Sequence, residues 1–405
     1  FSQYRTRVVT QRREYLSYLA ETRDAVRKVA KKQRAYYNWV YPDPDALVTL
    51  AANGSRLWSR EGNTYDVLTF RYGSGTQPLG LTFERPPIDP MTEMDVVCLS
   101  AMERFIAVHD HTDNVGKFLY LGDFSHIEVV GEGESAYDEM RAIMMHLACF
   151  IEPSKLKIAV LCSADRLGDW EWVKWMPQAR SANVRDAIGP ARMISTDPRE
   201  LVEMIGPDIA MRGAYRPGEE MPEWPHLLLV CDGAEFPTSS PFGSMVGVRG
   251  VTIMSRAREW TPMKSHTALR LVIHPSPNRK GADVVDVVTM DSVPESAFAD
   301  RLSAVQAEAV ARRMTPFATQ EKLEVGHAGG PLGRVAPEGP HGAGRHRRHS
   351  RLRPGEAVGA TRGACAPGRS FCRDARGPAR RPGHQGIRPA GYGSARPADR
   401  RDRFG

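Results

Sequence analysis

The chain has 405 residues, of which 41% are hydrophobic, so it is long enough to bury one large core or two smaller ones. Its formal net charge of +7 is unevenly distributed. The segment from Leu323 onward holds 17 arginines and six acidic residues, whereas residues 1–322 carry a net charge of −4. Because residues 1–34 hold ten Lys and Arg against three acidic residues, a basic arm precedes an acidic body.

The cysteines indicate a reducing compartment. Six cysteines show no CxxC spacing, and Cys162 and Cys231 lie in apolar runs typical of buried strands, which disfavours a disulfide framework. No apolar run approaches the roughly 20 residues that cross a bilayer, and no signal peptide is present. The chain begins with Phe instead of Met, so we expect a fragment of a longer protein.

A long basic helix is predicted for the first segment. Residues 5–37 contain no Gly or Pro, and Tyr15, Leu19, Val26 and Ala30 form a narrow apolar stripe. "YPDPDAL" ends this helix and begins a short second one near Asp45. The positive charges either belong to a solvated surface or face anionic lipid headgroups as a juxtamembrane stalk. We take residues 1–41 as this helical stalk.

Residues 42–320 are predicted to form an α/β domain. Strands are expected at 68–72, 125–131, 156–163, 226–233, 251–255 and 268–274, and helices near 92–108, 134–151, 198–206 and 295–313. Continuous apolar strands separated by amphipathic helices are typical of a doubly wound, mostly parallel sheet with helices on both faces.

The segment "IEVVGEGESAYDEM" has the strand, glycine turn and helix start of a phosphate-binding loop. Gly131, Gly133 and Ser135 are the residues that would cradle an anion. The turn lacks the Lys of a GxxxxGK[ST] motif and carries Glu132 and Glu134, which would repel a triphosphate. We therefore expect a degenerate site, with Glu134 and Ser135 capping the helix.

The apolar strand "HLLLVCDG" ends in Asp232, as in a Walker B strand. An Asp at the carboxyl end of a central parallel strand lies where ligands bind in such sheets. Many α/β strands end in Asp-Gly turns, so this signal alone is weak. We predict a vestigial nucleotide site made of Gly131, Gly133, Ser135 and Asp232, with no catalytic residue.

Three tryptophans and a nearby arginine, Trp170, Trp172, Trp175 and Arg180, lie in "DWEWVKWMPQAR". They are either core anchors or a partner contact, since exposed Trp and Arg are common in binding hot spots.

"HDHTD" at 109–113 does not predict a metal site, because His109 and His111 do not share a helix face and no second pair of ligands accompanies them.

The chain resembles one family, the FtsK/SpoIIIE-type ATPase (EccC) of bacterial type VII (ESX) secretion systems. The resemblance covers roughly residues 1–330 and rests on motifs in the family's order: "YRTRVVTQRREYLSYLAETR", "RLWSREGNTYDVLTFRYGSG", "WEWVKWMPQAR", "HLLLVCDG" and "ESAFADRLSAVQAEAVARRMTP".

The resemblance implies a membrane-proximal stalk that couples two preceding membrane helices to following ATPase modules, which bind ATP and Mg²⁺. It also implies a location at the cytoplasmic side of the membrane, other ESX membrane components as partners, a hexameric motor and export of WXG100-type substrates. This chain would hold no cofactor and bind no specific nucleic acid. The alternatives are a fragment of an FtsK-like DNA translocase, or basic nucleic-acid-binding protein, and a standalone nucleotide-binding enzyme.

The tail, residues 321–405, is rich in Arg, Gly, Pro and Ala and is predicted to be disordered. The segment "GHQGIRPAGYGSARPADRRDRFG" can be back-translated through the degenerate genetic code. Some of the resulting DNA sequences, read one base later, encode a strand and turn similar to the family's first P-loop. We therefore expect a single-base frameshift near 320–334, and the alternative is a natural basic tail. Sequencing the DNA across this junction distinguishes the two.

Overall fold

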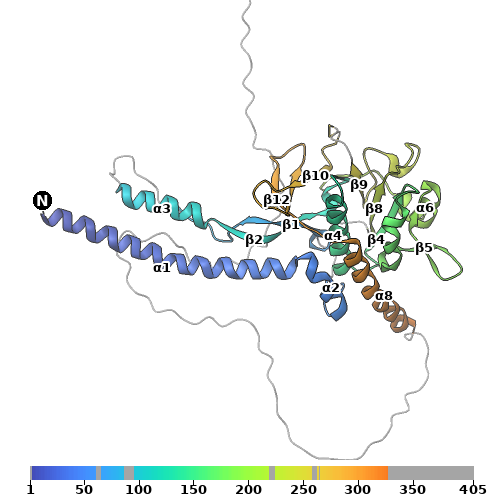
Figure 1. The fold of residues 1–405 in the computed structure, drawn as a ribbon, viewed down its shortest axis with the longest axis horizontal. Coiled ribbons are helices and arrows are strands. Elements are labelled where there is room, and N and C mark those ends of the chain that lie inside the picture. Colours follow the sequence, from blue (N-terminus) through green and yellow to red (C-terminus); the bar gives the residue numbers. More distant parts are fainter. Residues whose placement is uncertain are drawn as a thin grey trace, which may run out of the picture.

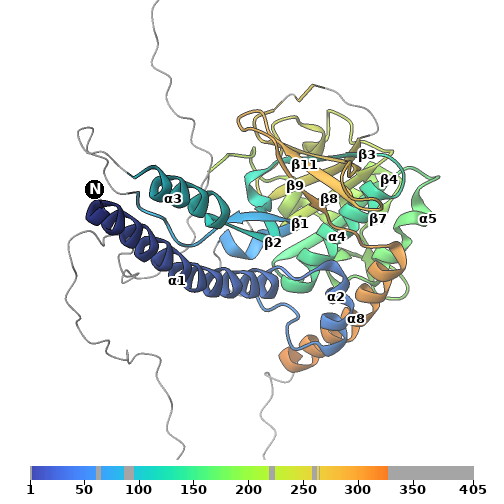
Figure 2. The same ribbon diagram turned by 60° about the vertical axis from the view of Figure 1, so that its left-hand side comes forward.

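The fold comes from a computed structural model that describes residues 2–60, 65–85, 95–218, 224–257, 262–263 and 265–326. A long helical arm extends from a body built on one large sheet (Figures 1 and 2). Residues 321–326 end the last helix, and the remainder of the tail, for which we predicted disorder, lies outside the described residues.

The centre of the body is a parallel sheet. Six strands in the order β10-β3-β9-β8-β4-β7 pair in parallel. Their bounds are β3 His126–Gly131, β4 Leu156–Cys162, β7 Ile194–Ser195, β8 His226–Asp232, β9 Val251–Ala257 and β10 Ala268–Pro275. From β3 the chain passes to β4, three strands away in the sheet, and it later returns through β8 and β9 to β10, on the other side of β3. The winding therefore reverses at β3. This arrangement confirms the predicted α/β class.

Four antiparallel strands extend the sheet beyond β10 in the order β11-β12-β1-β2. They are β1 Thr69–Pro78, β2 His111–Tyr120, β11 Asp283–Val288 and β12 Glu295–Ala299. A separate ribbon pairs β5 Arg180–Arg185 with β6 Pro190–Arg192. The hairpin of β1 and β2 leads from the body into the arm (Figure 1).

Helices bury both faces of the sheet, as doubly wound sheets require. The larger core lies under α2 Pro44–Asn53, α4 Ser135–Phe150, α8 Ala304–Gly326 and the 3-10 turn η3 Glu171–Trp175, which follows the short α5 Leu167–Trp170. The second core lies under α6 Pro198–Ile205 and α7 Pro207–Ala210. Along β8, Leu228 and Val230 face the first core, whereas Leu227 and Leu229 face the second.

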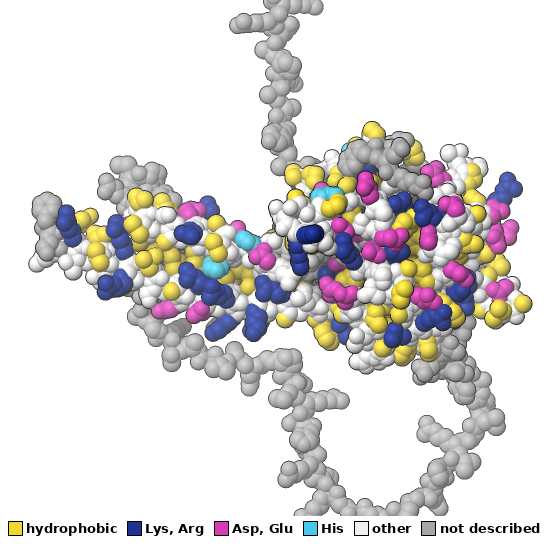
Figure 3. All heavy atoms as spheres, viewed as in Figure 1, with side chains coloured by type: hydrophobic (Ala, Val, Ile, Leu, Met, Phe, Trp, Pro, Cys, Tyr) yellow, Lys and Arg dark blue, Asp and Glu magenta, His cyan; other side chains and the backbone are white. Residues whose placement is uncertain are grey.

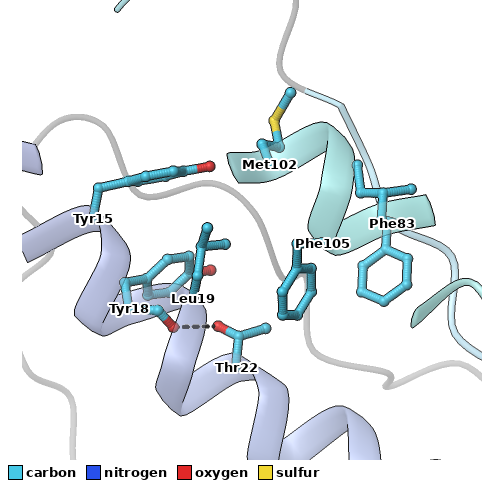
Figure 4. A pocket seen from close by; sticks show the side chains of 8 residues that line it. Tyr15, Tyr18, Leu19, Thr22, Phe83, Met102 and Phe105 are labelled. Carbon is cyan, nitrogen blue, oxygen red and sulfur yellow. Dashed lines mark hydrogen bonds between the residues drawn. The ribbon is translucent and has the colours of Figure 1, made fainter. Parts of the chain in front are cut away.

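The arm consists of two helices, α1 Ser2–Val40 and α3 Val96–His109. The 39 residues of α1 confirm the predicted long helix and give it a length of about 58 Å. Leu19 and Val26 of its apolar stripe are buried with Phe105 of α3. Figure 4 shows this contact, where Leu19 and Phe105 meet beside Tyr18. At the start of α3, Asp95 caps the helix and forms an ion pair with Arg12 at 2.7 Å.

Most of the positive charge of α1 stays on the surface. Lys and Arg side chains gather along the arm in Figure 3, and Arg5, Arg13, Lys28 and Lys32 are exposed. A role facing lipid headgroups therefore stays a prediction. Among the described residues, no helix is both long enough and apolar enough to cross a bilayer.

Three arginines of the body hold the carboxyl end of α1. Arg56 donates to the carbonyl of Trp39 at 2.6 Å, Arg60 to that of Val40 at 3.4 Å, and Arg71 to that of Tyr41 at 3.0 Å. The last turn of α1 contains no basic residue of its own. Because the last carbonyl groups of a helix have no partners within it and carry negative partial charge, these guanidinium groups both cap α1 and fix it to the sheet.

A buried group of charges lies behind this junction. Arg71 forms an ion pair with Asp300 at 2.8 Å, and both side chains are nearly inaccessible to solvent. Glu139 is fully buried, and neither of its carboxylate oxygens has a hydrogen-bond partner. Burial raises the pKa of Asp300 to about 6 although Arg71 opposes the shift. Burial and the neighbouring Asp300 raise the pKa of Glu139 well above its ordinary value.

One helix prediction was wrong. Residues 295–313 do not form a single helix, because 295–299 are the strand β12, which pairs with both β11 and β1. The helix α8 begins only at Ala304. Its start is marked by a capping box, in which Ser303 and Gln306 exchange hydrogen bonds with each other's backbone N–H groups.

We expect Glu139→Gln to flatten the pH dependence of stability. A carboxyl group whose pKa is raised by folding stabilises the protein when protonated, and this stability is lost as the pH rises through the folded-state pKa. For Asp300 the loss occurs between its ordinary value of 3.8 and about 6. The amide cannot ionise, so the variant keeps the stability that the wild type loses when Glu139 deprotonates, and urea unfolding between about pH 5 and pH 8 should show a gain of order 1–3 kcal/mol over the wild type at the upper end.

The matched control is Glu132→Gln, which changes an exposed carboxylate seven residues earlier, in the turn before α4. Its stability should follow the wild-type pH curve. Parallel curves for wild type and Glu139→Gln would show that the buried carboxyl does not ionise in this range.

Candidate functional site

The predicted site residues lie at the carboxyl edge of the parallel sheet. Gly131 ends β3, Gly133 and Ser135 lead into α4, and Asp232 ends β8. Because β9 lies between β3 and β8, the turn and Asp232 are two strands apart on the same edge. This is the edge at which open α/β sheets bind ligands, next to the point where the winding reverses.

Glycine is required at two positions of the turn, for a different physical reason at each. A Cβ atom on Gly131 would lie 3.2 Å from the Cβ atoms of both Ala136 and Ile273, so this position must remain small for β3, α4 and β10 to pack closely. Gly133 has a φ of +58°, a conformation that favours glycine. The side chain of Ser135 donates to the carbonyl of Glu132 at 2.9 Å, which stabilises the turn.

The predicted capping of α4 is not seen. Glu134 occupies the N-cap position, but its side chain makes no cap hydrogen bond and instead pairs with Arg141 at 3.0 Å. Arg141 also pairs with Asp138 at 2.7 Å. Glu132 and Glu134 are exposed beside the turn, so the negative charge that opposes phosphate binding is present where the sequence predicted it.

The carboxylate of Asp232 is buried and accepts hydrogen bonds from two aromatic side chains. The residue is 2% exposed, and the indole N–H of Trp170 donates to its Oδ2 atom at 2.9 Å. The hydroxyl of Tyr137, in the first turn of α4, donates to Oδ1 at 3.3 Å. The two aromatic rings meet edge to face, with centroids 6.2 Å apart. Both oxygens of Asp232 are therefore engaged in a closed aromatic cluster.

Several arginines surround the ring of Tyr137, and two of them lie nearest. The guanidinium carbons of Arg256 and Arg166 lie 4.6 Å and 5.6 Å from its ring centroid. Burial, together with the charge of Asp232, raises the pKa of Tyr137, so its hydroxyl remains a donor at neutral pH. A tyrosine under arginine side chains thus fills the space between the glycine turn and Asp232.

Sequence reasoning missed Tyr137, Arg166 and Arg256. Tyr137 stands inside the quoted turn motif, but nothing in the motif shows that its hydroxyl reaches across β9 to Asp232. Arg256 lies at the end of β9, so only the strand order places it beside the turn. The position of an arginine at the carboxyl end of a buried strand was the available signal.

The tryptophans act mainly as core anchors. Trp170 and Trp172 are 1% and 6% exposed, so their side chains do not present a surface to a partner. Trp175 is half-buried and packs against α8, where Arg312 lies 4.1 Å from its ring. Arg180 is half-buried at the start of β5. A partner contact stays a prediction for Trp175 and Arg180.

The "HDHTD" segment joins α3 of the arm to β2. His109 ends α3 with its ring 4.7 Å from that of Phe105, and His111 contacts Asp110 at 2.6 Å. In the part of the chain that the structure describes, no three His, Cys, Asp or Glu residues are grouped in a way that would hold a metal ion.

The sequence is similar to known EccC proteins of ESX secretion systems. No family model matches the chain. It is 30% identical to the ESX secretion system protein EccC of Thermomonospora curvata over 320 residues, or 78% of this chain. It is 34% identical to the ESX-3 secretion system protein EccC3 of Mycobacterium tuberculosis over 61% of this chain, and 28% identical to EccCa1 of the ESX-1 system of the same organism over 75%.

The matched part is a minority of each relative. It covers 24% of the Thermomonospora curvata protein, 18% of EccC3 and 39% of EccCa1. The functions of the complete relatives therefore depend also on segments that have no counterpart in this match.

We expect Trp170→Phe to destabilise the protein by about 1–3 kcal/mol, because it leaves the buried carboxylate of Asp232 without its strongest donor. Trp175→Phe is the matched control, since it removes an indole five residues farther along the chain, at the end of η3, but the Nε1 atom of Trp175 has no hydrogen-bond partner. Urea unfolding of both variants provides the measurement. Equal losses would mean that the bond to Asp232 contributes nothing beyond packing.

Proposed function

We propose, on the premise that the chain is an EccC-type sequence of an ESX secretion system, that it forms the membrane-proximal stalk of the secretion motor. In this role the arm leads from a membrane anchor at the cytoplasmic side to ATPase modules that follow in the complete protein. Those modules, and not this domain, would bind ATP and Mg²⁺ and drive export of WXG100-type substrates.

The occupied carboxylate of Asp232 is the observation that carries this proposal. Phosphoryl transfer requires a carboxylate that is free to act on a metal ion or its water, and a cation that neutralises the phosphates. Here Trp170 and Tyr137 donate to both oxygens of Asp232, and the turn carries Glu132 and Glu134 without a lysine. A ligand would have to break two buried hydrogen bonds and enter next to two carboxylates. The fold thus retains the site's position without its chemistry.

The arm supplies the mechanical part of the proposal. Its helix α1 is fixed at the body by Arg56, Arg60 and Arg71 and is supported farther out by α3. A helix held at its end and along its side can transmit displacement and orientation, which an isolated helix on a flexible linker cannot. We propose that this connection sets the position of the motor relative to the membrane.

The partners follow from the same proposal. They would be other ESX membrane components and further copies of this chain, since the complete motor would be a hexamer in the membrane.

The purified chain should show no ATP turnover. We expect phosphate release in the presence of Mg²⁺ and ATP to equal that of the buffer, because the glycine turn has no lysine and both oxygens of Asp232 already accept hydrogen bonds. Asp232→Ala serves as the comparison, and its rate should be the same. Turnover by the wild type that Asp232→Ala abolishes would contradict the stalk assignment and favour an active nucleotide site.

A further inference from the structure

The ribbon of β5 and β6 places two arginines directly opposite each other. In the antiparallel register, Arg180 of β5 is the partner of Arg192 of β6. Directly paired residues of an antiparallel ribbon have Cα atoms about 4.5–5.5 Å apart and side chains on the same face. Like charges in this arrangement repel each other and destabilise the pairing.

Neither arginine is neutralised within the described residues. No carboxylate lies within ion-pair distance of either guanidinium group in this part of the chain, and the Nε atom of Arg180 and the Nη1 atom of Arg192 are buried without an acceptor. Burial, with a further contribution from Arg192, lowers the pKa of Arg180. Leaving charged donors partly desolvated and unpaired is costly, and a negative charge bound at the accessible side of the two guanidinium groups would offset part of that cost.

One carboxylate near the arginine pair, that of Asp186, already accepts hydrogen bonds from the backbone. Asp186 lies in the turn of the ribbon, and Arg192 contributes to lowering its pKa. However, its Oδ1 atom accepts hydrogen bonds from the backbone N–H groups of Ile188 and Gly189, both at 2.8 Å. Asp186 therefore stabilises the turn and does not form an ion pair with either arginine.

The surroundings are those of a protein contact. Ile188, at the tip of the ribbon, is 97% exposed, and Lys157 brings a third positive charge close, because its amine donates to the carbonyl of Arg180 at 3.3 Å. Arginine side chains are common in binding surfaces, where they bind carboxylates through two parallel hydrogen bonds.

We propose that Arg180 and Arg192 form a docking site for an acidic segment of a protein partner. The partner's carboxylates would accept hydrogen bonds from the N–H groups of these half-buried arginines that stay accessible, and Ile188, at the other end of the ribbon, would contact its apolar atoms. This proposal goes beyond the stalk function and does not depend on it, because the site lies at the edge of the sheet beyond β7, on another part of the body from Asp232.

A fluorescein-labelled hexaglutamate peptide tests the site by fluorescence anisotropy at low ionic strength, with hexaglutamine as the uncharged comparison. The double variant Arg180→Gln/Arg192→Gln should bind hexaglutamate about tenfold more weakly than the wild type. The matched control, Arg185→Gln/Arg199→Gln, removes the same charge from exposed positions of the same region and should lose less than about twofold. Equal losses in the two variants would overturn the proposal, because they would reflect net charge alone.

Two further measurements separate the remaining explanations. The melting temperature of the Arg180→Gln/Arg192→Gln variant should be at least that of the wild type, since the substitution removes repulsion, and a large decrease would mean that the pair has a structural role. Inorganic phosphate at constant ionic strength should displace the peptide no better than chloride. Preferential displacement by phosphate would overturn the assignment of a protein segment as the occupant.

Discussion

The hydrogen bonds from Arg56, Arg60 and Arg71 to the last carbonyl groups of α1 determine how the arm and the sheet act together. They satisfy the helix end where it has no partners of its own and place positive charge at the negative end of its dipole. Arg56 and Arg60 come from the segment after α2 and Arg71 comes from β1, so the arm cannot rotate without breaking several contacts at once. Arg71 in turn is held by Asp300 at the start of the segment that leads into α8. The ends of α1, β1 and β12 are thus fixed to one another.

In the same body, side chains of the protein fill the carboxyl edge of the parallel sheet, where such sheets bind ligands. The glycine turn and Asp232 lie at the edge where open α/β sheets bind ligands, but Trp170 and Tyr137 donate hydrogen bonds to Asp232, and arginines lie over the ring of the tyrosine. These contacts fill the edge with packed side chains. A body whose ligand-binding edge is filled in this way suits the proposed stalk better than it suits an enzyme that must admit and release a nucleotide.

Local patterns predicted most of the fold. The absence of Gly and Pro from residues 5–37 gave α1, and the continuous apolar runs gave β3, β4, β8, β9 and β10 within one or two residues. Prediction failed where long-range pairing decides the structure. Residues 295–299 become a strand because β11 and β1 lie on either side, and α3 belongs to the arm because Phe105 meets Leu19. The positions of Gly131 and Asp232 were predictable from strand ends. The contacts that close the site were not, since they join α4, α5 and β9 across the sheet.

The central claim is that α1 and the sheet move as one body. Spin labels at Arg13→Cys in α1 and Asn278→Cys beyond β10, with Cys98, Cys365 and Cys372 replaced by serine, allow the distance between arm and body to be measured by double electron–electron resonance. We predict one narrow distance distribution, which broadens when Arg56 and Arg60 are both replaced by methionine. A broad distribution in the protein with all three arginines intact would contradict it.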